Sequence, residues 1–184
     1  NPKTGQPFGA TTKAFADWAE AQKKDVLTTE QFALVQQMAD SVQRHEVARD
    51  LLSDGVAEGV VRSEYCGVPC QIRIDWFAPH RAICDLKTVD SMDYFEADAR
   101  RYGYCHQLAF YVAVLRQRIG LRMPAFFIAI EKREPFRTGV WRIADEVLQH
   151  ATRENEAAIR RLRECAASGN WPTGYEDQRF FDYL

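Results

Sequence analysis

The sequence predicts an α/β domain in which helices flank a central mixed sheet. Three observations support this class. Apolar residues recur at helical spacing near both ends, residues 56–88 break into three short β-like runs, and a long helical stretch separates these runs from two further strands. The order is helix, three strands, helix, two strands, helix, which is typical of a layered α/β structure. The 184 residues are enough for one ordinary domain with a hydrophobic core.

The N-terminal part of the chain is predicted to be helical after a polar start. A short helix is expected around 11–23. Thr28 followed by Gln31 is the pattern of a capping box and begins the next helix. Apolar residues then recur three or four positions apart along this helix. His45 lies three positions after the last of them, so we expect it on the buried side of the helix. We expect the helix to break near 45–46.

Residues 56–88 are predicted to form an antiparallel meander. The runs "EGVVRSEYC", "CQIRIDWF" and "RAICDLKT" are separated by the turn signals "GVP" and "APH". Side chains alternate between the two faces along a strand. Asp75 is therefore expected on the face that Ile74 does not occupy, and Asp85 is expected on the same face as Lys87. The short turn at 78–81 places Asp75 across from about position 84 or 85, so the two aspartates should lie close together.

The C-terminal half continues the alternation of helices and strands. The predicted elements are a helical stretch over 91–119 divided at Gly103, strands over 124–132 and 138–144, and a helix over 145–167. An aromatic tail is expected to cover the core. We assign one domain over 1–184, made of an N-terminal extension (1–27), a core (28–167) and the tail (168–184).

The composition excludes a membrane-spanning protein and does not by itself indicate nucleic-acid binding. No apolar run approaches the roughly 20 residues that span a bilayer, and the formal net charge is −2. Arginines are nevertheless locally dense, and this indicates either a solvated face or a basic wall beside an acidic pocket. The polar start does not read as a signal peptide. The missing initiator Met raises the expectation of a fragment or processed piece of a longer protein.

The five cysteines are an odd number, which favours reduced thiols and a cytoplasmic location over a disulfide framework. Cys66 and Cys70 bracket a tight turn. They are expected to be packing residues, because the metal-knuckle alternative lacks a second Cys/His pair at matching spacing.

The residues with candidate chemistry centre on the stretch "CDLKT", which contains Asp85, and on Asp75, ten residues earlier. Two neighbouring carboxylates repel unless a cation lies between them. Asp75, Asp85 and the carbonyl of Leu86 would give oxygen ligands for Mg²⁺, with Mn²⁺ as a substitute. Lys87 could then hold a scissile phosphate or activate water, which is metal-assisted phosphodiester hydrolysis. Asp85 and Lys87 could instead form a simple surface ion pair, and His45 could be a core histidine and not a residue of the metal site.

These residues resemble a known nuclease signature. "RIDWF" followed by "CDLKT" is similar to the PD-(D/E)xK motif, and "QLAFY" supplies a downstream Gln-x-x-x-Tyr of the RecB-like branch. The wider stretches "NPKTGQPFGATTKAFADWA", "EYCGVPCQIRIDWF", "FFIAIEKREPF" and "GNWPTGY" resemble the RecE-type exodeoxyribonuclease domain (exodeoxyribonuclease VIII) of phages and prophages. The resemblance covers nearly the whole chain and implies a restriction-endonuclease-like core.

The resemblance also implies roles for individual residues. Asp75 and Asp85 would hold the catalytic Mg²⁺ with His45 as a further ligand, and Lys87 would be the catalytic lysine. Further candidates are Glu64, as a catalytic acid or a simple surface carboxylate, and Gln107, Tyr111 and Tyr104, as residues that line the site and contact DNA or that pack the helix.

The implied activity is 5′→3′ degradation of linear double-stranded DNA that leaves 3′ overhangs for recombination. The implied partners are duplex DNA ends, a single-strand annealing protein and other copies of the chain in a closed ring. Two alternatives stay open. One is a structure-specific or single-strand nuclease on the same scaffold, although the cysteines do not cluster as in relatives with an iron–sulfur centre. The other is a non-catalytic DNA-binding recombination scaffold.

Overall fold

The computed structural model describes residues 3–6, 9 and 11–180, and the chain divides into two compact units, 1–40 and 41–184. The first unit holds α1 (Lys13–Ala21) and most of α2 (Thr29–Arg44). The predicted capping box is confirmed, because the Thr28 N–H donates to Gln31 Oε1 (2.9 Å) and the Gln31 N–H donates to Thr28 Oγ1 (3.2 Å). The predicted extension, residues 1–27, falls within this unit.

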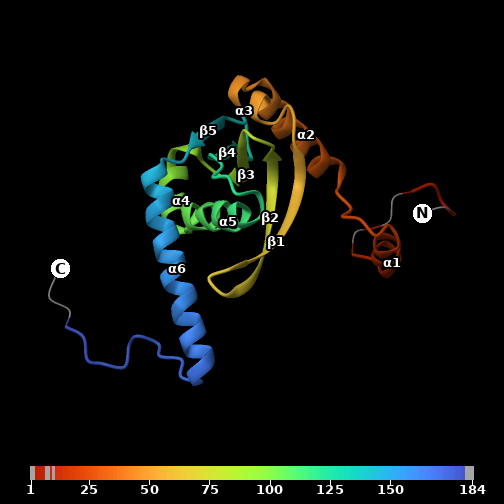
Figure 1. The fold of residues 1–184 in the computed structure, drawn as a ribbon. Helices are drawn as coiled ribbons and strands as arrows, with labels where there is room; N and C mark the ends of the chain where they lie inside the picture. The colour runs from red at the N-terminus through yellow and green to blue at the C-terminus, as the bar shows by residue number, and fades with distance from the viewer. Residues whose placement is uncertain (1–2, 7–8, 10, 181–184) are drawn as a thin grey trace. The chain divides into compact units, whose positions relative to one another are not determined.

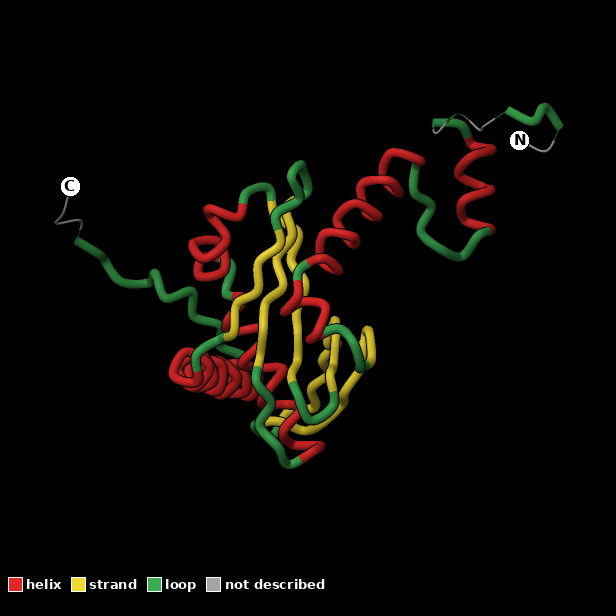
Figure 2. The backbone as a smooth tube through the Cα atoms, turned by 90° about the horizontal axis from the view of Figure 1, so that it is seen from above, coloured by secondary structure: helices red, strands yellow, loops and turns green. Residues whose placement is uncertain are grey.

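The second unit contains a mixed five-stranded sheet with helices against it (Figures 1 and 2). The strand order follows the chain, and every neighbouring pair is antiparallel except β3 and β4, which are parallel. This arrangement confirms the predicted restriction-endonuclease-like α/β class. Its elements are α3 (Glu46–Leu51), β1 (Val56–Tyr65), β2 (Val68–Ala78), β3 (Ala82–Val89), the 3₁₀ turn η1 (Met92–Tyr94), α4 (Phe95–Arg101), α5 (Tyr104–Ile119), β4 (Ala125–Glu131), β5 (Thr138–Arg142) and α6 (Asp145–Ser168).

The hairpin of β1 and β2 is closed by a two-residue turn, Cys66–Gly67. Both residues have a positive φ, 52° and 71°, as a type I′ turn requires to match the twist of its strands. Glycine adopts this conformation without strain. The turn fixes the register of the long hairpin and therefore the position of each residue along β2. Both cysteines of "CGVPC" are free thiols packed against the hydrophobic core.

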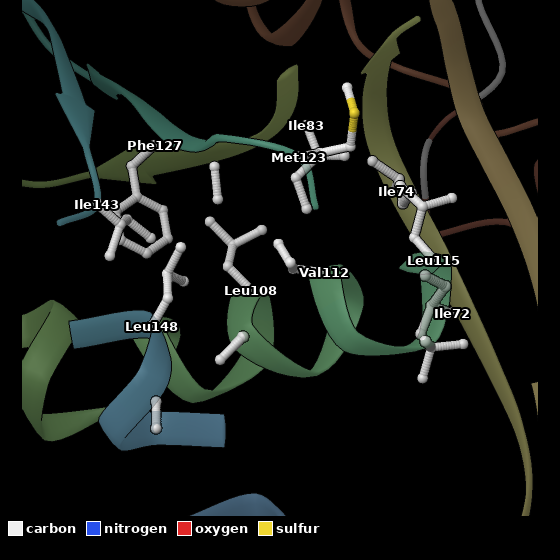
Figure 3. Packing of buried hydrophobic residues seen from close by; sticks show 14 of the residues in the cluster. Ile72, Ile74, Ile83, Leu108, Val112, Leu115, Met123, Phe127, Ile143 and Leu148 are labelled. Atoms are coloured by element: carbon white, nitrogen blue, oxygen red, sulfur yellow. The ribbon is translucent and has the colours of Figure 1, made fainter. Parts of the chain in front are cut away.

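Helix α5 covers the sheet and supplies much of the core. Leu108, Val112 and Leu115 point from it toward the sheet, where they meet isoleucines of β2 and β3 such as Ile74 and Ile83 (Figure 3). These positions recur at intervals of three and four residues, which align on one side of a helix. The predicted division at Gly103 is confirmed, because Gly103 has φ +68° between α4 and α5.

Helix α6 packs against α5. The Asn155 side chain donates to the His106 carbonyl (2.8 Å), and His106 Nε2 lies 2.6 Å from Glu154 Oε2.

The expectation that the aromatic tail covers the core is wrong for the described residues up to 180, since Trp171 and Tyr175 are 59% and 74% exposed. Among the described residues, no helix has the length and apolar character needed to cross a bilayer.

We expect Leu108→Ala to lower the free energy of unfolding by about 2–5 kcal/mol, because it removes a fully buried side chain from the centre of the core. Denaturant unfolding followed by circular dichroism measures the change. Leu162→Ala is the matched control, since Leu162 is half exposed on α6. Its effect should stay within about 0.5 kcal/mol. Equal losses in the two variants would contradict this description of the core.

Candidate active site

The site lies where β2 and β3 stop pairing. Their antiparallel ladder runs from Ala78↔Ala82 to Trp76↔Cys84, so the next position along the register sets Asp75 opposite Asp85. Here the Asp75 side chain replaces the missing ladder partner, because Asp75 Oδ2 accepts the backbone N–H of Leu86 at 2.9 Å. The predicted proximity of the two aspartates is thus confirmed in the register of the strands.

The backbone of the β1–β2 hairpin is irregular at this point, which differs from the regular alternation expected. Ile74 and Phe77 both pack against the core although they are three residues apart. Strict alternation would place them on opposite faces. Glu58, the residue opposite Asp75 in the register, has φ +55° and interrupts the pairing. The interruption lies directly beside Asp75, whose side chain reaches the Leu86 N–H of β3.

Asp85 is buried, and its charge is incompletely compensated. Its side chain is only 2% exposed. Oδ1 accepts a hydrogen bond from Gln107 Nε2 (3.2 Å). Oδ2 lies 2.6 Å from Lys87 Nζ, within ion-pair range, but among the described residues it is the one buried side-chain nitrogen or oxygen without a well-oriented hydrogen bond. Burial raises the pKa of Asp85, Lys87 opposes the rise and the nearby charge of Asp75 adds to it.

Lys87 is held from several sides by residues of α5. Its ammonium group donates to Gln107 Oε1 (3.1 Å) and lies 4.5 Å from the centre of the Tyr104 ring. Gln107 Nε2 also lies 3.1 Å from the Tyr111 hydroxyl, to which it donates. Gln107 therefore joins the lysine, the buried aspartate and Tyr111 in one network. The first turns of α5 face the site because the left-handed Gly103 sets the start of this helix.

The contacts of Tyr104 and Gln107 indicate a function that the sequence did not reveal. The expectation that they line the site and contact DNA stays a prediction; in the structure both contact Lys87, and Gln107 also contacts Asp85. Their i, i+3 spacing places them on one side of a helix, and that spacing was the available signal. A residue that touches two charged side chains in this way can orient both of them.

His45 is located at the predicted break but does not join the aspartates. It lies between α2 and α3 as the N-cap of α3, where its Nδ1 accepts the Ala48 N–H (3.3 Å). Among the described residues, no group of three or more His, Cys, Asp and Glu side chains is arranged to hold a metal. The role of His45 as a further metal ligand therefore stays a prediction.

Glu64 is located at the opposite end of the hairpin from Asp75. It pairs with Pro69 and is exposed. Pro69 is six residues from Asp75, or about 20 Å along a strand. The acidic residue of β1 that lies across from Asp75 is Glu58, whose Oε2 binds Arg73 Nε at 2.8 Å. A catalytic role for Glu64 stays a prediction without a contact to support it.

The donor set fits a hard divalent cation. Asp75 and Asp85 bring two carboxylates together where the pairing of β2 and β3 stops, and the buried Oδ2 of Asp85 has an ion-pair contact with Lys87 but no well-oriented hydrogen bond. The backbone carbonyl of Leu86, between Asp85 and Lys87, is a further candidate. Oxygen ligands of this kind suit hard divalent cations such as Mg²⁺ and Mn²⁺.

We expect Asp85→Asn to make the metal-free protein more stable than the wild type at pH 7. A folded-state pKa above the ordinary value, 3.8, means that the folded protein favours the protonated carboxyl. Stability is therefore lost as pH rises through the raised pKa, and Asn, which resembles the protonated form, avoids this loss. Thermal unfolding in EDTA from pH 4 to 8 should show a gap between the two proteins that narrows toward acid.

The control for this measurement is Asp54→Asn, because Asp54 is exposed in the turn before β1. It should leave the pH dependence of stability unchanged. An Asp85→Asn protein that is less stable than the wild type at pH 7 would contradict the burial cost assigned to this carboxylate.

Comparison with known proteins identifies the family and the fold of the chain. The sequence profile of the "PDDEXK-like domain of unknown function (DUF3799)" family matches residues 3–181. A crystal structure of a protein from Eubacterium rectale, provisionally named an exonuclease, superposes with a TM-score of 0.67 at 20% identity. The alignment covers 94% of this chain and 71% of that protein. At this identity the similarity establishes a common fold.

A second solved structure, an alkaline exonuclease from Laribacter hongkongensis, matches with a TM-score of 0.34 and 12% identity, over 87% of this chain and 89% of that one. This similarity is too low to support a conclusion. No curated protein sequence matches the chain. The family profile covers nearly the whole sequence, so the chain belongs to the PDDEXK-like DUF3799 family.

Proposed function

We propose that this domain is a divalent-metal-dependent nuclease that hydrolyses phosphodiester bonds in DNA. One observation carries the proposal: Asp75, Asp85 and Lys87 meet where β2 and β3 separate, and Gln107 links Lys87 to Asp85. A surface ion pair would not need a buried carboxylate, a bridging amide and an aromatic ring around the lysine. Buried charged groups cost stability, and such an arrangement is typical of functional sites.

The residues divide the work of hydrolysis between them. Asp75, Asp85 and the Leu86 carbonyl would hold Mg²⁺, which supplies Lewis-acid polarisation and lowers the pKa of water. Lys87 places its positive charge beside the scissile phosphate, where negative charge develops as the water oxygen bonds to phosphorus and the leaving oxygen departs with its electron pair. Gln107 and Tyr104 keep the ammonium group in place during this change.

The finer proposal concerns the substrate. The resemblance of the sequence to RecE-type exodeoxyribonucleases supports exonucleolytic degradation of linear duplex DNA in the 5′→3′ direction, with Mg²⁺ as the cofactor and Mn²⁺ as a substitute. It also supports a single-strand annealing protein as partner and a closed ring of copies around DNA. A ring would let a chain with net charge −2 bind DNA, because basic residues need line only the channel.

We expect Lys87→Ala to reduce the rate of DNA cleavage by about 100-fold or more, because the positive charge beside the reacting phosphate is lost. The measurement is nucleotide release from a blunt linear duplex in Mg²⁺, with EDTA as the metal-free reference. Asp85→Asn should lose activity to a similar extent, and Asp54→Asn, on an exposed turn, should retain it. Circular dichroism shows whether each variant is folded.

Cleavage by Lys87→Ala at the wild-type rate would overturn the site. Tight DNA binding without hydrolysis in either Mg²⁺ or Mn²⁺ would support the non-catalytic scaffold instead.

Direction and end dependence need a separate test. We expect a linear duplex labelled at one 5′ end to release its label early, and the same duplex labelled at a 3′ end to release it late. A covalently closed circle should stay intact, because an exonuclease requires an end. Rapid cutting of the circle, or of branched and single-stranded substrates in preference to duplex ends, would favour a structure-specific nuclease on this fold.

A further inference from the structure

A row of three side chains crosses the sheet from the candidate site to an aromatic pocket. Asp85 is paired with Phe127 in the parallel register of β3 and β4, and Phe127 is paired with Trp141 in the antiparallel register of β4 and β5. Residues paired in this way point to the same face of a sheet. Neighbouring strands are about 4.8 Å apart, so Trp141 is about 10 Å from Asp85 across the sheet.

The pocket at the far end of this row has a volume of about 290 Å³. Phe95 of α4 and Phe127 form its base, and they are 1% and 3% exposed. The half-buried indole of Trp141 forms a wall, with its ring centre 4.4 Å from that of Phe95. Ala99, Cys105, Ile143, Ala144 and Val147 complete the apolar lining. The concavity is therefore an aromatic pocket of about the size that a single planar ring system occupies.

The Trp141 ring is fixed in place by its surroundings. Its Nε1 donates to Glu96 Oε1 at 3.2 Å. A Cβ added at Gly139 would come within 2.5 Å of the indole, so the ring lies directly against this glycine. A rigid aromatic surface loses little conformational entropy when a ligand stacks on it.

Aromatic contacts connect the pocket to the catalytic lysine. The Tyr104 ring is 4.5 Å from Lys87 Nζ and 6.2 Å from the Phe127 ring, and Phe127 is 5.7 Å from Phe95. The pocket and the site therefore share one wall, made by the start of α5 and by β4. A strand of DNA with its phosphate at Lys87 would have its next nucleotides within reach of the pocket, since stacked nucleotides are about 3.4 Å apart.

The rim of the pocket carries positive charge. Arg100 of α4 and Arg142 of β5 are exposed and belong to the residues that line the pocket. Neither guanidinium group has an ion pair or a hydrogen bond with another described residue. Glu96, the acidic residue of the rim, accepts the Trp141 N–H. Two available guanidinium groups beside an aromatic wall suit a planar base that is attached to a phosphate.

We propose that this pocket binds one unpaired nucleobase of the DNA substrate. Trp141 stacks on the base, and Arg100 and Arg142 contact the adjoining phosphates. The assignment rests on the proposed nuclease function and names the part of the substrate that the pocket takes. The volume suits one base and is too small for a helix of a partner protein. The positive rim suits an anionic chain.

The test uses the wild-type protein in EDTA, so that binding is measured without cleavage. A fluorescent single-stranded oligothymidylate is bound, and an abasic residue is then moved along it one position at a time. We expect one position at which loss of the base weakens binding about 10-fold, as stacking on an aromatic side chain predicts. In Trp141→Leu this penalty should disappear, and in Trp141→Phe most of it should remain.

Trp171→Leu is the matched control, because Trp171 is exposed on the C-terminal tail. It should keep the full penalty at the same position. An equal penalty in the wild type and Trp141→Leu, or no sensitive position at all, would overturn the assignment. Should Trp141→Leu fail to fold, the double variant Arg100→Gln with Arg142→Gln takes its place. It should weaken binding and lower the slope of log affinity against log salt by about 1.4, and an unchanged slope would overturn the assignment.

The two proposals fail separately. A protein that cleaves DNA but shows no abasic effect dependent on Trp141 keeps the nuclease site and loses the pocket. A protein that shows the effect but does not cleave in Mg²⁺ or Mn²⁺ keeps the pocket and loses the proposed catalysis.

Discussion

The rest of the site depends on how this protein stabilises two carboxylates of like charge at the point where the pairing of neighbouring strands β2 and β3 stops. Asp75 is anchored by the Leu86 N–H, and Asp85 is buried beside Lys87 and Gln107. Repulsion between the aspartates and the loss of water around Asp85 both oppose ionisation, as the raised pKa of Asp85 reflects. The ammonium group of Lys87 offsets part of this cost. A cation between the carboxylates would offset more, and this links the burial of Asp85 to its proposed role.

The sheet brings these groups together because its strands pair only in part. If β2 and β3 continued as a regular ladder past Trp76 and Cys84, the Leu86 N–H would be taken by a backbone carbonyl and Asp75 would lie on the outer face. The ladder stops instead, beside the positive φ of Glu58 on β1 and between Ile74 and Phe77, which both pack against the core. Irregular strand backbone of this kind is common beside active sites, where it redirects a side chain.

Helix α5 connects the core, the site and the aromatic pocket. Its inward side packs Leu108 and Val112 against the sheet, and its first turn carries Tyr104 and Gln107 to Lys87. Cys105, between those two, lines the pocket of Trp141. Rigid packing of one helix therefore fixes both the proposed catalytic groups and the proposed base-binding surface. A site built on such an element holds its geometry better than one built on loops.

The sequence by itself determined the α/β class, the capping box at Thr28, the break at His45, the division at Gly103 and, to within about one residue of register, the closeness of Asp75 to Asp85. These follow from local periodicity and short turns. The tertiary structure alone decided that Gln107 and Tyr104 hold Lys87, that Glu58 and not Glu64 lies across from Asp75, and that Trp141 lines a pocket beside the site. It also decided that the described part of the tail does not cover the core. The physical reason is that periodicity reports which side of an element is apolar. Contacts between residues distant in sequence depend on register, on local backbone irregularity and on packing between elements, none of which leaves a local pattern.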